Sequence, residues 1–259
     1  IEPFLGGGSF FYYLQEFQDT LGFSKKGYIS DINPHLIDFF KELKANPEKL
    51  YKKAEKLVIK HNEFTTKQEH EKNYFDNREL FRKKPSPSYF LYLNKLCFNG
   101  LYREGPQGFN VPLGFPISKW NHSLEHFLKW QKLLKNFDLN ACSFLETLKK
   151  ANDGDLIYLD PPYVDRSDSE NQTFRGYNKK EFNEDDLAEM SKAVKKLNPK
   201  CKILISNFNE YHATKFFKKS DGWIKTPLAK KYAISGISEG VFEAKEVLIS
   251  NFKVDIIST

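Results

Sequence analysis

The sequence has few cysteines and no long apolar run, and both absences narrow the class of protein. The cysteines are three in number, without paired or metal-type spacing, which indicates a reducing compartment and argues against zinc: Cys97, Cys142 and Cys201. No run approaches the roughly 18 apolar residues of a membrane span, and no signal peptide opens the chain. We therefore expect a cytoplasmic protein. Because the first residue is Ile1 rather than methionine, we expect the numbering to begin inside a longer product.

The length, composition and charge of the chain predict a globular protein with a basic surface. A length of 259 residues with 40% hydrophobic residues suffices for one large domain, or for one domain carrying a smaller insertion. Lysines spread over a solvated surface would explain the net charge of +6. They cluster, however, in "KELKANPEKLYKKAEKLVIK" and "FRKKPSPSYF", between aromatic residues. This clustering favours a surface that follows phosphate groups.

Short apolar segments predict an α/β fold. Each is rich in β-branched or aromatic residues, as in strands that are covered on both faces: Ile1–Phe4, "GYIS" ending at Ser30, Leu139–Ser143, "DLIYL" before Asp160, Lys202–Ser206 and "KEVLISNF". Helical patterns separate several of them. One is "KEFNEDDLAEMSKAVKKL", with Leu187, Met190, Val194 and Leu197 on one face. Strands that alternate with helices predict a parallel, doubly wound, Rossmann-like sheet.

The middle of the chain predicts a helical insertion that carries a β-hairpin. Asn46-Pro47 is expected to start a helix with a buried stripe of Leu50, Ala54, Leu57 and Val58. Ser86-Pro87 is expected to start another helix, which runs through Phe90, Leu93 and Cys97. Leu101–Arg103 and Phe109–Val111 then flank a Gly-Pro-Gln-Gly turn. We therefore divide the chain into a first catalytic part (1–44), an insertion (45–117) and a second catalytic part (118–259).

Two motifs near the start predict a nucleoside-binding edge. The glycines of "EPFLGGGSF" follow the first expected strand and precede a helical pattern, so the backbone can approach a ligand there, although an ordinary tight turn is the alternative. Asp31 ends the next expected strand, where an acid accepts both hydroxyls of a ribose in nucleoside-binding α/β folds. Its alternative role is to cap the helix that begins at "NPHLIDFF".

The stretch "LDPPY" brings a carboxylate, two prolines and an aromatic ring to the end of a buried strand. Methyl transfer to an exocyclic amine calls for this set. The carboxylate of Asp160 and a backbone carbonyl accept the two N–H bonds, so that the nitrogen lone pair points at the methyl donor. Pro162 stiffens the turn, and Tyr163 can stack on a base. A purely structural turn is the alternative, and no metal is implied.

In this order, "EPFLGGGS", "YISDINPHLI", "FNGLYREGPQGFNVPLG", "DPPY" and "EVLISN" cover nearly the whole chain. The sequence resembles the N6-adenine DNA methyltransferases of the Dam type, the D12 class with the α-type motif order. The resemblance implies S-adenosylmethionine as methyl donor, double-stranded DNA as substrate, and action in a bacterial or phage-infected cell at the nucleoid. It also implies a possible restriction endonuclease that shares the DNA site.

The resemblance assigns roles by matching position. The expected cofactor residues are Glu2, Phe4, Gly6, Gly8, Asp31, Ile32, Ser143, Phe144 and Asp160. Serine at position 143 departs from the acid or asparagine that is common there. Asp160, Pro161, Pro162 and Tyr163 would hold the target adenine. The family usually carries an upstream segment, with an aromatic residue and a lysine that close over the cofactor, and this chain begins after it.

In the hairpin, the expected DNA-binding residues are Phe98, Asn99, Leu101, Arg103, Asn110 and Pro112. Arg103 can bind guanine O6 and N7, while leucine and proline can contact a thymine methyl group. The alternatives are a phosphate or surface contact for Arg103 and core packing for Leu101 and Phe98. The polar stretch "VDRSDSENQTFRGYNKK" corresponds to a family loop that closes over a flipped base, and a plain surface loop is its alternative.

The sequence thus predicts an adenine-specific DNA methyltransferase, with GATC as the site that the Leu-x-Arg hairpin most resembles. The alternatives are a cytosine-N4 or RNA base methyltransferase, or a DNA-binding relative that has lost catalysis. A nicotinamide-dependent oxidoreductase is disfavoured, because the glycine spacing does not fit and no hydride-transfer constellation is present.

Overall fold

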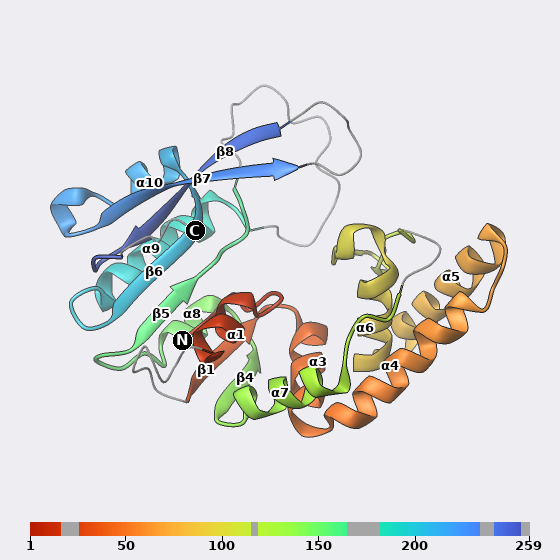
Figure 1. Ribbon diagram of the computed structural model, residues 1–259. Helices are drawn as coiled ribbons and strands as arrows, with labels where there is room; N and C mark the ends of the chain where they lie inside the picture. The colour runs from red at the N-terminus through yellow and green to blue at the C-terminus, as the bar shows by residue number, and fades with distance from the viewer. Residues whose placement is uncertain (17–25, 115–118, 165–181, 234–240, 255–259) are drawn as a thin grey trace.

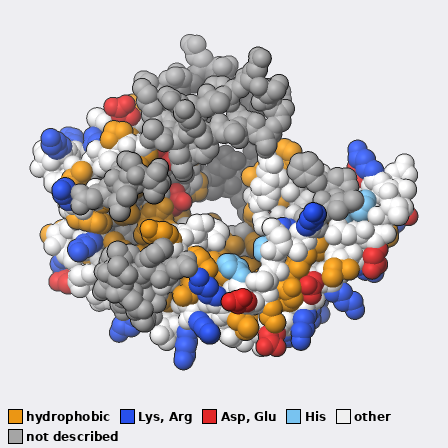
Figure 2. Space-filling view, viewed as in Figure 1, with side chains coloured by type: hydrophobic (Ala, Val, Ile, Leu, Met, Phe, Trp, Pro, Cys, Tyr) orange, Lys and Arg blue, Asp and Glu red, His pale blue; other side chains and the backbone are white. Residues whose placement is uncertain are grey.

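The computed structural model describes residues 1–16, 26–114, 119–164, 182–233 and 241–254, apart from the side chains of 207, 229–233 and 241–245. The protein is a mixed α/β structure. Figure 1 shows β5 to β8 with α9 and α10 on one side of the molecule, and α4 to α6 on the other. In Figure 2 the same face is hollowed between these two sides. In the described part of the chain, no helix is both long and apolar enough to cross a membrane.

The strands form two main groups. A four-stranded sheet has the order β5-β6-β8-β7, and a separate pair joins β1 to β4. The pairs β1/β4 and β5/β6 are parallel, whereas β8 is antiparallel to both of its neighbours. The bounds are β1 Gly27–Asp31, β4 Phe137–Ala141, β5 Leu156–Leu159, β6 Lys202–Asn209, β7 Ile224–Ala233 and β8 Val241–Ser250.

The first residues of the chain join the two groups. The backbone of Ile1 exchanges hydrogen bonds with Leu156 and Tyr158 of β5, and the backbone of Glu2 exchanges hydrogen bonds with Tyr28 and Ser30 of β1. The expectation of a regular strand over Ile1–Phe4 was wrong, because this pairing is confined to Ile1 and to the isolated bridge between Glu2 and Ile29. Pro3 explains the interruption, since it has no N–H group to continue the ladder.

The expectation of a fully parallel sheet was also wrong. β7 was not predicted, because its sequence IKTPLAKKYA contains a proline and three lysines instead of an apolar run. In the described strand order β7 lies at one end of the sheet, next to β8 alone. A strand with one neighbour tolerates both proline and charge. Because β7 and β8 form an antiparallel pair, the sheet is mixed.

The expected strand over Leu139–Ser143 is displaced toward the N-terminus. β4 runs from Phe137 to Ala141, and Ser143 instead caps α8 (Phe144–Leu148). A capping box forms here, in which the Ser143 side chain accepts from the backbone of Glu146 and the Glu146 side chain accepts from the backbone of Ser143. Serine followed three residues later by glutamate is the sequence signal for this cap.

The helices begin where the proline and cap signals predict. Pro47 opens α4 after Asn46, and Pro87 opens α6 after Ser86, whose side chain accepts from the backbone of Tyr89. Asn46 makes no side-chain cap bond. The remaining bounds are α1 Ser9–Glu16, α3 Pro34–Ala45, α4 Pro47–Asn62, α5 Lys67–Lys83, α6 Pro87–Leu96, η1 Phe98–Gly100, α7 Leu124–Leu134, α9 Glu184–Leu197, α10 Glu210–Phe216 and η2 Lys219–Asp221.

Among the residues that the structure describes, three groups of buried side chains form the core. One lies between the four-stranded sheet and α9, where Leu187, Met190 and Val194 are buried as expected. A second packs α3 and α7 onto β1 and β4. A third lies among α4, α5 and α6, and includes Phe109 of the short hairpin β2 (Glu104–Gly105) and β3 (Gly108–Phe109).

Candidate active site

The carboxyl ends of β1, β4 and β5, together with the glycine turn after residue 5, border one cavity of about 600 Å³. A volume of this size is typical of a small-molecule site. All the residues that the sequence predicted for the cofactor line it: Glu2, Phe4, Gly6, Gly8, Asp31, Ile32, Ser143, Phe144 and Asp160. Pro161 and Pro162 also line it, whereas Tyr163 lies outside and is 52% exposed.

The glycine turn is fixed to β1 through the Asp31 carboxylate. The Gly6 N–H donates to Oδ2 at 3.0 Å, and the Asn33 N–H donates to Oδ1 at 2.9 Å. Asn33, rather than Asp31, caps α3, since its side chain accepts from two backbone N–H groups. The alternative role of Asp31 as the helix cap was therefore wrong, and Asp31 faces the cavity instead.

Gly6 and Gly8 both have positive φ angles, of 49° and 72°. A Cβ atom at position 8 would lie 2.8 Å from the Trp130 ring, whereas position 6 faces open space. The turn leads directly into α1 at Ser9. The glycine run therefore gives a close backbone approach at the cavity and a helix N-terminus beside it, as the motif predicted.

Three aromatic rings form one wall of the cavity. Phe4 stacks on Phe144 at a ring-centroid distance of 5.4 Å, and Phe182 meets both rings at 5.7 and 5.9 Å. Elsewhere in the lining, Phe10 stacks on Tyr158 at 3.7 Å. Sequence reasoning missed Phe182. The sequence does contain a sign of it, because Phe182 directly precedes the Asn183 cap of α9. An apolar residue at this position commonly packs against the first turn of the helix.

The Asp160 turn is held by hydrogen bonds from β6. The Ser206 hydroxyl donates to Asp160 Oδ1 at 2.9 Å and lies 2.8 Å from the Tyr158 hydroxyl. Because a serine hydroxyl has one proton, Tyr158 is the donor in the second contact. Burial raises the pKa of Tyr158 to about 12, which keeps this donor protonated. Ser206 was not among the predicted site residues.

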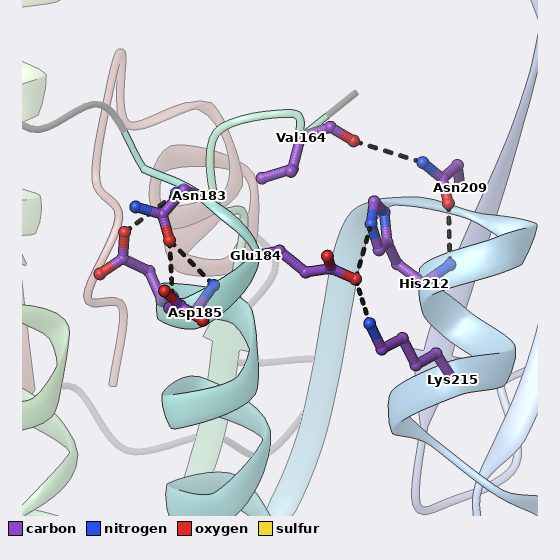
Figure 3. A network of polar contacts seen from close by, with 8 residues as sticks. Val164, Asn183, Glu184, Asp185, Asn209, His212 and Lys215 are labelled. Carbon is purple, nitrogen blue, oxygen red and sulfur yellow. Dashed lines mark hydrogen bonds and ion pairs between the residues drawn. The ribbon is translucent and has the colours of Figure 1, made fainter. Parts of the chain in front are cut away.

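Val164, at the exit of the same turn, accepts from Asn209 Nδ2 at 3.3 Å. Figure 3 shows this contact beside a polar network at the start of α9. The polar stretch expected to close over a base falls, after Val164, on residues 165–180, which lie outside the described residues.

Glu2 is buried in the cavity lining near Asp160. Burial, together with the smaller effect of the nearby Asp160 charge, raises the pKa of its carboxyl to about 8. A carboxyl group in this environment binds a proton near neutral pH and releases it when a cation arrives. The cavity therefore contains two neighbouring acids with different environments.

The predicted DNA-binding residues of the hairpin region are exposed, except for Asn110, which is half-buried. Leu101 and Phe98 are 52% and 50% exposed, so the alternative that they pack in the core was wrong. Arg103 Nε donates to Asn110 Oδ1 at 2.7 Å across the hairpin. The expected strand at 101–103 was wrong, because the regular ladder lies beside the turn and its first strand is Glu104–Gly105. Of the expected strand at 109–111, only Phe109 belongs to β3.

The underside of the hairpin is packed onto the helices. Arg82 Nε donates to the Phe109 carbonyl at 2.9 Å, and the Tyr74 hydroxyl donates to the Val111 carbonyl at 3.0 Å. The backbone then continues antiparallel, with the Phe98 N–H donating to the Pro112 carbonyl at 3.0 Å. These hydrogen bonds therefore hold the backbone that carries the exposed side chains. Asn99, in the same region, has a positive φ of 54°.

Comparison with known proteins agrees with these features. A family model described as D12 class N6 adenine-specific DNA methyltransferase matches residues 1–227. The type II methyltransferase M.MjaIII of Methanocaldococcus jannaschii is 33% identical over 89% of this chain and 80% of the relative. The DNA adenine methylases of Vibrio cholerae serotype O1 and Escherichia coli K12 are 30% and 27% identical, over 84% and 85% of this chain and 75% of each relative. The chain therefore belongs to the D12 class of N6 adenine-specific DNA methyltransferases.

Proposed function

We propose that the cavity binds S-adenosylmethionine and that the Asp160 turn presents an adenine of duplex DNA to it. When bound, this cofactor supplies an electrophilic methyl group on a sulfonium. The observation that carries the proposal is the shared cavity. Asp160 and Pro161 border the same space as the glycine turn and Asp31, so a target amine at the turn would meet a cofactor held by the glycines.

The residues of the cavity fit such a cofactor. The positive φ angles of Gly6 and Gly8 allow the backbone to approach a ligand. The carboxylate of Asp31, held by two N–H groups, can accept the ribose hydroxyls. The rings of Phe4 and Phe144 offer an apolar wall. Ser143 already accepts from the Glu146 backbone, which leaves the cofactor adenine with a weaker partner at this position.

In the proposed reaction, Asp160 and the Pro161 carbonyl accept the two N–H bonds of adenine N6. This withdraws the nitrogen lone pair from the ring and directs it at the methyl carbon. A methyl group transferred there from the sulfonium would leave the electron pair of the broken S–C bond on sulfur. The proton that N6 then loses would pass to the Asp160 carboxylate, which already accepts one of its N–H bonds. Tyr163, exposed beside the turn, would stack on the flipped base. We expect no metal to take part.

We propose that residues 45–117 form the target-recognition unit and that its hairpin reads a short site. The support is the buried cluster among α4, α5 and α6, although Leu36, Phe39 and Trp120 from outside this range also pack against it. Arg103 would bind a guanine, and Leu101 and Pro112 would contact a thymine methyl group. GATC is the site to test first. A restriction endonuclease that shares the site is a further part of the proposal.

Sequencing of DNA from cells that express the full-length protein, with detection of modified bases, tests chemistry and site together. The proposal predicts N6-methyladenine at one short motif. Modified cytosine, or unmodified DNA from cells that contain the folded protein, would contradict it.

A further inference from the structure

The C-terminal part of β6 contacts the catalytic turn, Asp160–Val164, at both of its ends. Ser206 donates to Asp160 at the entry of the turn. Asn209, three residues later, donates to the carbonyl of Val164 at the exit, as Figure 3 shows. The turn is therefore held between two side chains of a neighbouring strand.

An irregularity in β6 explains how both side chains reach the same turn. Side chains alternate between the faces of a regular strand, so positions 206 and 209 would point to opposite faces. The pairing of β6 with β8 shifts register between Ile205 and Phe208. Such a shift turns the side chains beyond it, and strand irregularities of this kind occur next to active sites. Asn209 follows the shift, whereas Ser206 lies within it.

Both ends of the Asn209 amide are used. Its Oδ1 accepts from the backbone N–H of His212 at 2.9 Å, which caps α10, while its Nδ2 donates to Val164. These two bonds fix the orientation of the amide. One side chain thus links the start of a helix to the exit of the turn.

α10 is itself tied to the helix beside the cavity. Glu184, the first residue of α9, makes an ion pair with Lys215 and approaches His212 Nε2 at 3.8 Å (Figure 3). His212 is buried, and burial lowers its pKa. Phe182, directly before the α9 cap, belongs to the cavity wall. The start of α9 therefore contacts both α10 and the wall of the cofactor cavity.

We propose that Asn209 is a positioning residue for methyl transfer. Its amide sets the exit of the catalytic turn relative to α10, and thereby the placement of the Pro161 carbonyl and Tyr163 against the target base. This inference rests on the proposed function, which gives the turn its role in holding the amine. Asn209 does not need to touch either substrate.

Asn209→Asp should keep the hydrogen bond to the His212 N–H and remove the one to the Val164 carbonyl. Aspartate retains an oxygen to cap α10 and is a preferred cap residue, but it has no donor for the Val164 carbonyl. Asn209→Ser, with another preferred cap residue and no amide, is the second variant. Ser123→Ala is the matched control, because it removes the cap of α7 without contact to the turn.

We expect both Asn209 variants to lower kcat by about tenfold or more, because a displacement of about 1 Å at a reacting group costs up to roughly 100-fold. The KM for S-adenosylmethionine and the Tm should stay near those of the unchanged protein. Ser123→Ala should lower the Tm and leave kcat unchanged. An unchanged kcat in both Asn209 variants, or a kcat that falls only with the Tm, would overturn the inference.

Hydrogen exchange supplies a readout that needs no catalysis. The amides of Tyr163 and Val164 should exchange faster in Asn209→Asp than in the unchanged protein, and at the unchanged rate in Ser123→Ala. Equal exchange in all three proteins would also overturn the inference. If the unchanged protein transfers no methyl group to DNA, the proposed function fails, and the exchange experiment still decides whether Asn209 holds the turn.

Discussion

Ser206 Oγ lies 2.9 Å from Asp160 Oδ1 and 2.8 Å from the hydroxyl of Tyr158. The two hydroxyls form a chain of donors that ends on the carboxylate proposed to hold the target amine. A hydrogen bond to a charged acceptor is stronger than one between neutral groups. These two hydrogen bonds therefore fix the rotation of the Asp160 carboxylate about its Cβ–Cγ bond.

Ser206→Ala should lower kcat by about tenfold while DNA binding is retained, because the Asp160 carboxylate loses its fixed orientation. Ser206→Thr retains the hydroxyl and should recover much of the rate. Single-turnover methyl transfer with both variants measures the effect. Equal rates for the alanine variant and the unchanged protein would refute a role for this hydroxyl.

Gly8→Ala should destabilise the protein by about 1–3 kcal/mol, the usual cost of overpacking a tight site. The added Cβ would lie 2.8 Å from the Trp130 ring, and the backbone has a φ of 72°. Gly7→Ala is the matched control, since nothing lies within 4 Å of a Cβ there. Denaturant unfolding compares the two, and similar stabilities would show that the turn relaxes around the methyl group.

The raised pKa of Glu2 should make cofactor binding depend on pH. With a pKa raised to about 8, the carboxyl is protonated at neutral pH and must lose its proton to pair with the ammonium of S-adenosylmethionine. Affinity should therefore rise as the pH rises toward about 8, by up to about tenfold per pH unit. It should fall again at higher pH, where the ammonium of the ligand, with an ordinary pKa of about 8, loses its own proton. Calorimetry in buffers of different ionisation enthalpy measures the proton release. Glu2→Gln should abolish it, and the same release from both proteins would exclude Glu2 as its source.

Arg103→Ala should relax sequence discrimination by about 1–3 kcal/mol at one guanine, because a bidentate contact to O6 and N7 is lost. Lys83→Ala, an exposed change on α5, should leave the preference for that base unchanged. The ratio of kcat/KM for the methylated motif and for a motif with that guanine replaced gives the result. An unaltered ratio in Arg103→Ala would favour a phosphate contact instead.

The parts of the site that depend on local sequence were predictable. Turn glycines, proline at helix starts and an acid after a buried strand are local signals, so Gly6, Asp31 and Asp160 were expected at one cavity, and all three line it. The cap of α3 was considered only as an alternative role of Asp31, although Asn33, a cap-type residue directly before the helix, forms it.

The parts that depend on distant pairing were not predictable. The register shift of β6 arises from its pairing with β8, some 40 residues further along the chain. No local pattern shows that this shift brings Asn209 to Val164. Phe182 is likewise separated in sequence from Phe4 and Phe144, and only the packing of α9 brings the three rings together. β7 lacks an apolar run, so only its pairing with β8 identifies it as a strand.

The most direct test of the central claim is methyl transfer by Asp160→Ala. Labelled S-adenosylmethionine and plasmid DNA are incubated with the unchanged protein and with the variant, and the DNA is digested to nucleosides. The unchanged protein should yield labelled N6-methyladenine, and a variant that still binds the same DNA should yield none. Undiminished transfer by Asp160→Ala, or label in cytosine, would contradict it.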